Sequence, residues 1–219
     1  MKKSELINLI QSLKTFQSPK AHYEQYYTDA IATADIFYHI AFERQDLNNR
    51  LVIDLGCGGG NLSIAAAVLG APKTIGIDID PEALSICQEN IDSLQLNDKI
   101  TLIQGDLTTL KLEETILNVT NWDTLDKSAI LVVSNPPFGV KRRGIDVIFL
   151  KQAISISNLI YSLHLSHPQN REFLIRKISQ LGGRVDHVFT LQLVLKHSYS
   201  YHKKKQKYIH ADLFRIIKL

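Results

Sequence analysis

Cysteine, proline and tryptophan are scarce in this chain of 219 residues, which has two cysteines, six prolines and one tryptophan. Two cysteines, Cys57 and Cys87, form neither a disulfide framework nor a four-thiol zinc site, so we expect free thiols in a reducing compartment. The eight histidines show no metal-ligand spacing, and we expect no metal site. Glycine and proline are too sparse for a long linker.

Long apolar runs are also absent. No window reaches the ~18 consecutive apolar residues of a membrane helix, and residues 1–5 lead into an amphipathic segment instead of a signal-peptide core. We therefore expect a cytoplasmic protein with no membrane contact. Hydrophobic residues at 45% and charged residues at 21% are ordinary globular values, and they exclude a disordered chain.

Positive charge is modest in total and concentrated locally. The net charge is +3, yet no acidic residue occurs between Asp186 and Asp212. A solvated loop is one explanation for such a basic run, and a binding site for a structured RNA is the other. The candidate RNA-binding residues are Lys141, Arg142, Arg143, His202, Lys203, Lys204, Lys205 and Lys207.

Apolar periodicity predicts an α/β fold. We predict strands over 51–55, 74–79, 100–104, 130–134 and 159–163, with helices over 60–69, 81–94, 144–157 and 169–181. This alternation is typical of a parallel sheet with helices on both faces. Residues 185–196 and 207–217 predict an antiparallel strand pair. The result is a Rossmann-like, seven-stranded sheet, mostly parallel, with an antiparallel C-terminal pair.

The N-terminal part carries helical patterns over 2–14 and 28–44. We expect residues 1–48 to be a helical extension that serves as a cofactor lid within the same domain. Residues 49–219 then form the catalytic domain.

A glycine-rich turn, Asp54-Leu55-Gly56-Cys57-Gly58-Gly59-Gly60, follows the first strand and opens a helix. Glycine allows a sharp turn and close approach of a ligand, and the helix start presents free N–H groups. A tight structural turn or a dinucleotide site remains an alternative. Because Asp54 would repel a pyrophosphate, we favour a cationic ligand, S-adenosylmethionine.

Two further acidic candidates for the cofactor site, Asp78 and Asp106, stand at the ends of the second and third predicted strands. Asp78 lies 22 residues after Gly56, close to the spacing at which an acid meets ribose hydroxyls in Rossmann-type sites. Asp80 precedes Pro81, which predicts a helix N-cap. Asp106 follows the third strand, where its carboxylate suits the exocyclic amine of the cofactor's adenine.

The fourth motif, Asn135-Pro136-Pro137-Phe138, follows the strand 130–134. Consecutive prolines hold an extended backbone with free carbonyl acceptors. The Asn135 side chain and the Pro136 carbonyl are suited to accept the two N–H bonds of an exocyclic amine, while Phe138 stacks on the base. The amine nitrogen is a poor nucleophile, so catalysis is mainly positioning.

These motifs resemble those of S-adenosylmethionine-dependent methyltransferases that modify adenine N6. More narrowly, the chain is similar to the family that methylates one adenosine of small-subunit ribosomal RNA in eukaryotes and archaea. Segments 24–26, 144–146, 160–164 and 202–205 match that family's pattern, and the resemblance covers about residues 20–217. It implies cofactor contacts at Gln25, Thr28, Gly56, Gly59, Asn61, Asp78 and Asp106. Asp54 and Gly58 complete the expected cofactor set.

The resemblance also implies a partner. Eukaryotic relatives use a small zinc-binding activator protein that pairs with the methyltransferase sheet. We expect the strand 100–104 at one edge, open to strand addition. Alternatively, the helix-like residues 111–120 cover that edge.

Other functions remain open at this point. The same chemistry acts on DNA adenine or protein glutamine in proteins that share the Asn-Pro-Pro motif. A non-catalytic RNA-binding or ribosome assembly factor on this fold is a third possibility. A nicotinamide dehydrogenase is disfavoured by Asp54 and by the antiparallel ending.

Overall fold

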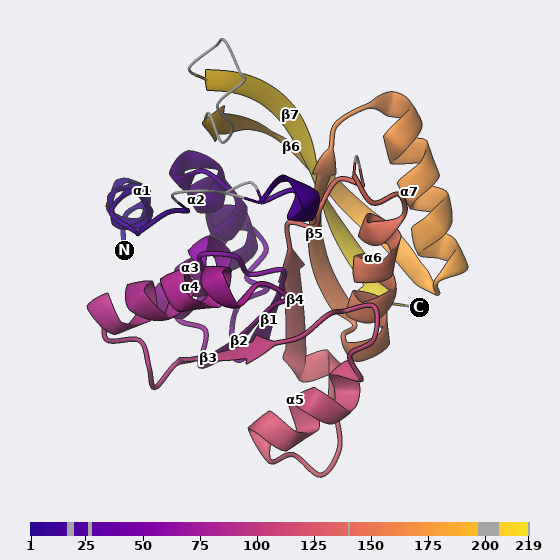
Figure 1. The fold of residues 1–219 in the computed structure, drawn as a ribbon. Coiled ribbons are helices and arrows are strands. Elements are labelled where there is room, and N and C mark those ends of the chain that lie inside the picture. The colour runs from indigo at the N-terminus through magenta and orange to yellow at the C-terminus, as the bar shows by residue number, and fades with distance from the viewer. Residues whose placement is uncertain (17–19, 26–27, 140, 197–205, 219) are drawn as a thin grey trace.

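The computed structural model describes residues 1–16, 20–25, 28–139, 141–196 and 206–218. These residues include a seven-stranded sheet in the order β3-β2-β1-β4-β5-β7-β6 (Figure 1). Strands β1 to β5 are parallel to one another, and β7 runs antiparallel to both β5 and β6. The strands are β1 (Leu51–Leu55), β2 (Lys73–Asp78), β3 (Ile100–Gln104), β4 (Ile130–Ser134), β5 (Leu159–Leu165), β6 (Gly183–Lys196) and β7 (Gln206–Lys218).

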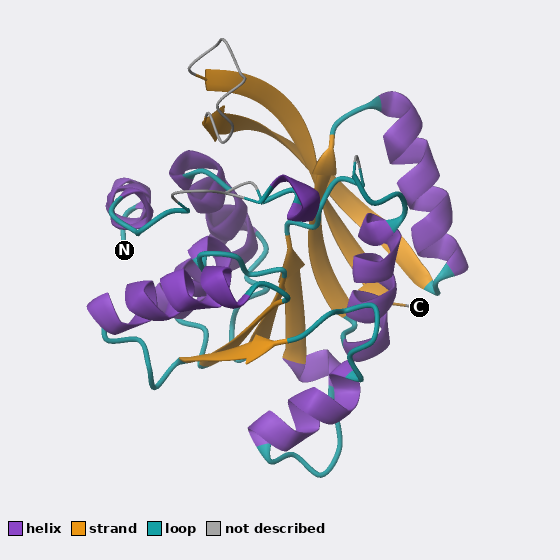
Figure 2. Ribbon diagram, in the orientation of Figure 1, coloured by secondary structure: helices purple, strands orange, loops and turns teal. Residues whose placement is uncertain are grey.

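Helices cover both faces of this sheet (Figure 2). One buried apolar cluster lies under α1 (Lys3–Gln11), α2 (Ala30–Tyr38), α3 (Asn61–Val68) and α4 (Pro81–Ser93). The other lies under α5 (Leu112–Thr120), α6 (Ile145–Ile156) and α7 (Pro168–Gln180). Short helical turns occupy Ala21–Tyr23, His39–Glu43 and Lys127–Ala129. The predicted three-layer α/β architecture, with its antiparallel ending, is confirmed.

Side-chain caps start two of these helices. Asp29 accepts hydrogen bonds from the backbone N–H groups of Ile31 and Ala32 at the start of α2. Asp80 accepts from the N–H of Glu82, and Pro81 occupies the first position of α4. The predicted N-cap is therefore confirmed.

The predicted helix over 28–44 is not continuous. Its second part is a wider π-type turn, His39–Glu43, in which the N–H of Arg44 donates to the carbonyl of His39. The buried His39 ring stacks on Phe189, with 4.9 Å between ring centroids. Packing against β6 therefore outweighs the regular helical pattern here.

The end of the sheet is held to the N-terminal part by buried polar contacts. Arg215 on β7 donates to Asp46 at 2.7 Å, and the Tyr161 hydroxyl on β5 donates to the same carboxylate at 2.7 Å. Burial raises the pKa of the Tyr161 hydroxyl. Among the described helices, none is long and apolar enough to cross a lipid bilayer.

Candidate active site

The turn between β1 and α3 is tied to the neighbouring strand. The N–H groups of Gly56 and Cys57 both donate to the carbonyl of Ile77, at 2.8 and 3.0 Å. Gly60, the N-cap of α3, has φ +91°, and a Cβ added there would lie 2.5 Å from the Cys87 sulfur. A side chain at position 60 would therefore strain the backbone and clash with Cys87 of α4.

Asp78 lies at the end of β2, directly beside this turn. Its Oδ2 accepts from the N–H of Gly58 at 2.8 Å, and its Oδ1 accepts from the N–H of Asp80 at 2.9 Å. Burial raises the pKa of this carboxyl. Asp106 follows the adjacent β3 and accepts from the N–H of Thr108, which lowers the pKa of Asp106. Both carboxylates therefore stand at the same edge of the sheet, as predicted.

Asp54, which the sequence analysis includes in the expected cofactor set, precedes the glycine-rich turn. It occupies the central strand β1, between Gly76 of β2 and Val133 of β4. The side chain is fully buried and accepts a hydrogen bond from the Ser63 hydroxyl of α3 at 2.6 Å. Burial raises its pKa to about 7. Asp54 therefore lies beneath the glycine-rich turn and not in the wall of the cavity described below.

The side chain of Asn135 has one defined orientation. Its Nδ2 donates to the Thr28 hydroxyl at 2.9 Å, and its buried Oδ1 has no hydrogen-bond partner among the described residues. The Thr28 carbonyl in turn accepts from Nδ2 of Asn61 at 2.8 Å. Thr28 thus connects the loop after β4 to the start of α3, and it leaves an amide oxygen of Asn135 unpaired.

The N-terminal segment closes one side of the site. Gln25 donates to Asp80 at 2.6 Å, and Lys20 donates to the other oxygen of the same carboxylate at 2.8 Å. Burial alone would raise the pKa of Asp80, but these two donors lower it overall. Phe16, His22, Tyr23 and Glu24 also line the site and were missed from the sequence as site residues. Only the family pattern that includes Glu24 and Gln25 pointed to this segment.

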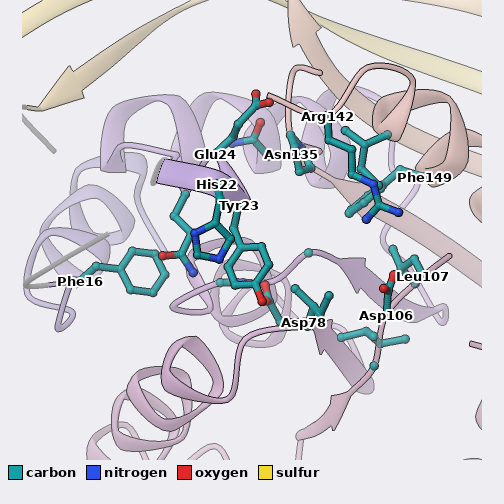
Figure 3. A pocket seen from close by; sticks show the side chains of 18 residues that line it. Phe16, His22, Tyr23, Glu24, Asp78, Asp106, Leu107, Asn135, Arg142 and Phe149 are labelled. Carbon is teal, nitrogen blue, oxygen red and sulfur yellow. The ribbon is translucent and has the colours of Figure 1, made fainter. Parts of the chain in front are cut away.

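These elements surround a cavity of about 900 Å³, a volume that includes space open to solvent (Figure 3). Predicted site residues that line it are Gln25, Gly56, Gly58, Asp78, Asp106, Asn135, Pro137 and Arg142. Others lie outside its lining, namely Thr28, Asp54, Gly59, Asn61, Pro136, Phe138, Lys141 and Arg143. Phe138 packs against the core under α1–α4.

The basic segments are described in part. Lys141, Arg142 and Arg143 are exposed, and the Arg142 charge helps to lower the pKa of Asp106. His202, Lys203, Lys204 and Lys205 lie outside the described residues, and the side chain of Lys207 is not described.

Comparisons with known proteins find similarity over the whole chain. The family model for ribosomal protein L11 methyltransferase (PrmA) matches residues 39–122. The rRNA N(6)-adenosine-methyltransferase METTL5 of Danio rerio is 36% identical over 217 residues, 98% of each chain. The Drosophila melanogaster enzyme of the same name is 33% identical, covering 98% of this chain and 96% of its own. A solved structure of a candidate RNA methyltransferase from Pyrococcus horikoshii is 30% identical, with TM-score 0.84 over 100% of this chain and 98% of that one.

Proposed function

Because this chain belongs to the METTL5 family of rRNA N(6)-adenosine-methyltransferases, we propose that it methylates N6 of an adenosine in structured RNA. S-adenosylmethionine is the methyl donor. The substrate in this proposal is small-subunit ribosomal RNA, and a cytoplasmic location would bring the enzyme to it.

The observation that carries this proposal is the fixed amide of Asn135. Because Thr28 accepts from Nδ2, the buried amide oxygen is the atom left for a substrate, and Asn135 lines a cavity together with Gly56 and Asp78. An unpaired buried acceptor is costly unless a ligand donates to it. An exocyclic amine supplies that donor.

The cavity also suits the methyl donor. Asp78 provides carboxylate oxygens at the end of β2, suited to ribose hydroxyls, and Asp106 at the end of β3 suits the amine of an adenine. The backbone at Gly56 and Gly58 lies open to the cavity, so a ligand can approach it closely. We assign Gln25 to the wall of this site, Gly59 and Asn61 to its margin, and residues 1–48 to its lid within the same domain; Thr28 holds Asn135 and Asn61 in place beside it.

Asp54 contributes in another way. Its buried carboxylate lies beneath the turn, where a negative charge stabilises a cationic ligand without touching it. Because burial raises the pKa of Asp54 to about 7, a bound cation would favour the charged form of this carboxyl.

The chemistry then follows from positioning. S-adenosylmethionine supplies an electrophilic methyl group when bound. Asn135 and the Pro136 carbonyl accept the two N–H bonds of adenine N6, which turns the nitrogen lone pair toward the methyl group. Phe138 would have to leave its core contacts in part to stack on the base, so we expect a local adjustment of this loop on RNA binding.

RNA binding is assigned to the two basic segments. Arg142 lines the cavity, while Lys141 and Arg143 flank it in sequence and are exposed. Phosphate contacts from such residues depend strongly on salt. The segment 202–207 is assigned to RNA on its basic composition alone, since residues 202–205 lie outside the described part of the chain.

The proposal is tested by methyl transfer from labelled cofactor. Total RNA lacking the modification, DNA and a glutamine-containing protein are incubated separately with the purified chain. The expected result is label in RNA alone, recovered as N6-methyladenosine at one position of small-subunit ribosomal RNA. Label in DNA or protein would contradict the proposed substrate, and no label in any sample would favour the non-catalytic alternative.

We also propose that a small zinc-binding activator protein pairs with β3. Among the described strands, β3 bonds with β2 alone and ends the sheet, as the sequence predicts. The alternative cover, α5, buries Leu112 and Ile116 in the core and packs against α6. An exposed edge is a site for strand addition.

The partner is tested by mixing the chain with the candidate activator and measuring melting temperature and activity. The exposed residue Thr101 on β3 is replaced by lysine, and the exposed residue Gln192 on the opposite edge strand β6 serves as control. We expect Thr101→Lys to weaken the complex and Gln192→Lys to leave it intact. A fully active monomer that gains nothing from the activator would contradict this proposal.

A further inference from the structure

Glu24 is a buried carboxylate that the sequence-derived site does not include. The residue is 7% exposed and lines the same cavity as Asn135. The residue follows the turn Ala21–Tyr23 and has φ +51°, a backbone conformation uncommon for a residue with a side chain. Such strain persists where the surrounding structure holds it, often at functional sites.

The two carboxylate oxygens of Glu24 have different surroundings. Oε1 accepts from the backbone N–H of Lys141 at 2.6 Å, which ties the N-terminal segment to the loop that follows Asn135. Oε2 is buried and has no hydrogen-bond partner within the described part of the chain. One oxygen thus anchors the loop, and the other remains available to a ligand.

The other carboxylates in the cavity wall are engaged elsewhere. Both oxygens of Asp78 accept backbone N–H groups, and Asp106 accepts from Thr108 at the end of β3. Figure 3 draws Glu24 close to Asn135 and apart from Asp78 and Asp106. The contact with Lys141 agrees with that view, because Lys141 belongs to the loop that begins at Asn135. Glu24 therefore lies at the end of the cavity where the proposed target amine enters.

Methyl transfer to an amine creates a need for a base. When the nitrogen lone pair forms the N–C bond, the methyl–sulfur bond breaks and its electron pair stays on sulfur. The nitrogen then carries positive charge and one proton too many, and the neutral product forms when that proton leaves. The amide oxygen of Asn135 and a proline carbonyl orient N–H bonds but are weak bases. A carboxylate stabilises the positive charge and accepts the proton.

We propose that Glu24 is a catalytic residue: as the methyl group is transferred, its Oε2 takes the N6 proton that the Pro136 carbonyl has oriented. This inference rests on the proposed function. In this arrangement Glu24 supplies the negative charge and accepts the proton, while Asn135 and the Pro136 carbonyl orient the amine.

The test compares Glu24→Gln and Glu24→Asp with the wild type in single-turnover RNA methylation, together with Kd for S-adenosylmethionine and S-adenosylhomocysteine. Glutamine keeps the acceptor for the Lys141 N–H and removes the charge. Aspartate keeps the charge and shortens the reach. We expect Glu24→Gln to slow methyl transfer by roughly 10²-fold, with both Kd values within about twofold of wild type. Glu24→Asp should be the faster of the two variants.

Asp146 offers a matched control. It is a partly buried acid on α6 whose charge interacts with that on Glu24, and it is not part of the cavity lining. Asp146→Asn removes the same charge nearby and should keep at least half of the wild-type rate.

Three results would overturn the role of Glu24. A Glu24→Gln rate within twofold of wild type would remove the need for a base here. If Glu24→Gln methylates RNA faster than Glu24→Asp, the role of Glu24 is to hold the loop through the Lys141 N–H and not to act as a base. A loss confined to cofactor and S-adenosylhomocysteine affinity would place Oε2 at the cofactor's ammonium. Absence of methyl transfer by the wild type would instead overturn the proposed function, and the inference with it.

Discussion

Replacing Gly60 by alanine adds a methyl group at the start of α3, where the chain has room for hydrogen only. The new Cβ would lie 2.5 Å from the Cys87 sulfur and 3.4 Å from Cδ1 of Ile64. The backbone at φ +91° adds a second cost, because side chains avoid this region. The conformational cost is about 1–3 kcal/mol, and overpacking in the core costs about 1–3 kcal/mol more.

Gly70, just after α3, separates these two costs. It has φ +109°, but nothing lies within 4 Å of an added Cβ. Gly70→Ala therefore carries a conformational cost without a clash. In urea unfolding at one pH without cofactor, Gly60→Ala should lower the free energy of unfolding by about 1–3 kcal/mol more than Gly70→Ala.

Truncating the neighbour should relieve the clash. In the double variant Gly60→Ala with Cys87→Ala, the decrease in the free energy of unfolding should be about 1–2 kcal/mol smaller than the sum of the decreases in the two single variants. Kd for S-adenosylmethionine should rise in Gly60→Ala and stay close to wild type in Gly70→Ala, since the turn before α3 forms the proposed cofactor site. Equal losses for the two glycine variants, or no relief from Cys87→Ala, would refute this reasoning.

Three further substitutions test other parts of the structure. The pKa of Asp54 is raised to about 7, so between about pH 4 and 7 the native state holds a proton that the unfolded state has lost. The free energy of unfolding therefore falls as the pH rises through this range. Asp54→Asn should remove up to about 4 kcal/mol of that fall, measured by urea unfolding at several pH values. Thr28→Val should slow methylation roughly tenfold with unchanged cofactor Kd, because Asn135 loses its orienting partner; a change in Kd alone would instead make Thr28 a cofactor contact. Arg171→Met removes two hydrogen bonds from the buried Asp212 carboxylate, which keeps the bond from the Thr190 hydroxyl. Because the Arg171 side chain is 42% exposed, the free energy of unfolding should fall by about 1–3 kcal/mol, and no measurable fall in urea unfolding would contradict this.

Most of the fold follows from apolar periodicity. Strands such as β1 and β4 are buried along their whole length, so four of the five residues in each are apolar and the strands are easy to recognise. The structure confirms each predicted strand, with ends displaced by at most two residues, and confirms β3 at the sheet edge. The π-type turn at His39–Glu43 was not predictable, since it depends on stacking with Phe189, which is distant in sequence.

The candidate site was predictable where it depends on strand ends. Asp78, Asp106 and Asn135 follow parallel strands, so a common edge of the sheet brings them together. Hydrogen bonds between distant segments were not predictable: Thr28 lies 107 residues from Asn135, and Glu24 lies 117 residues from Lys141. The bond of Asp54 to Ser63 was not predictable either, because strand alternation does not specify the partner of a buried side chain.

The central claim is that the Asn135 amide orients the target amine and has no part in holding the cofactor. The most direct measurement is the single-turnover methylation rate of Asn135→Ala on unmodified small-subunit ribosomal RNA, with Kd for S-adenosylmethionine measured by calorimetry on the same preparation. We predict a rate reduced by at least roughly 10²-fold, with a cofactor Kd within about threefold of wild type. Near-normal methylation, or a loss explained entirely by weaker cofactor binding, would contradict the account.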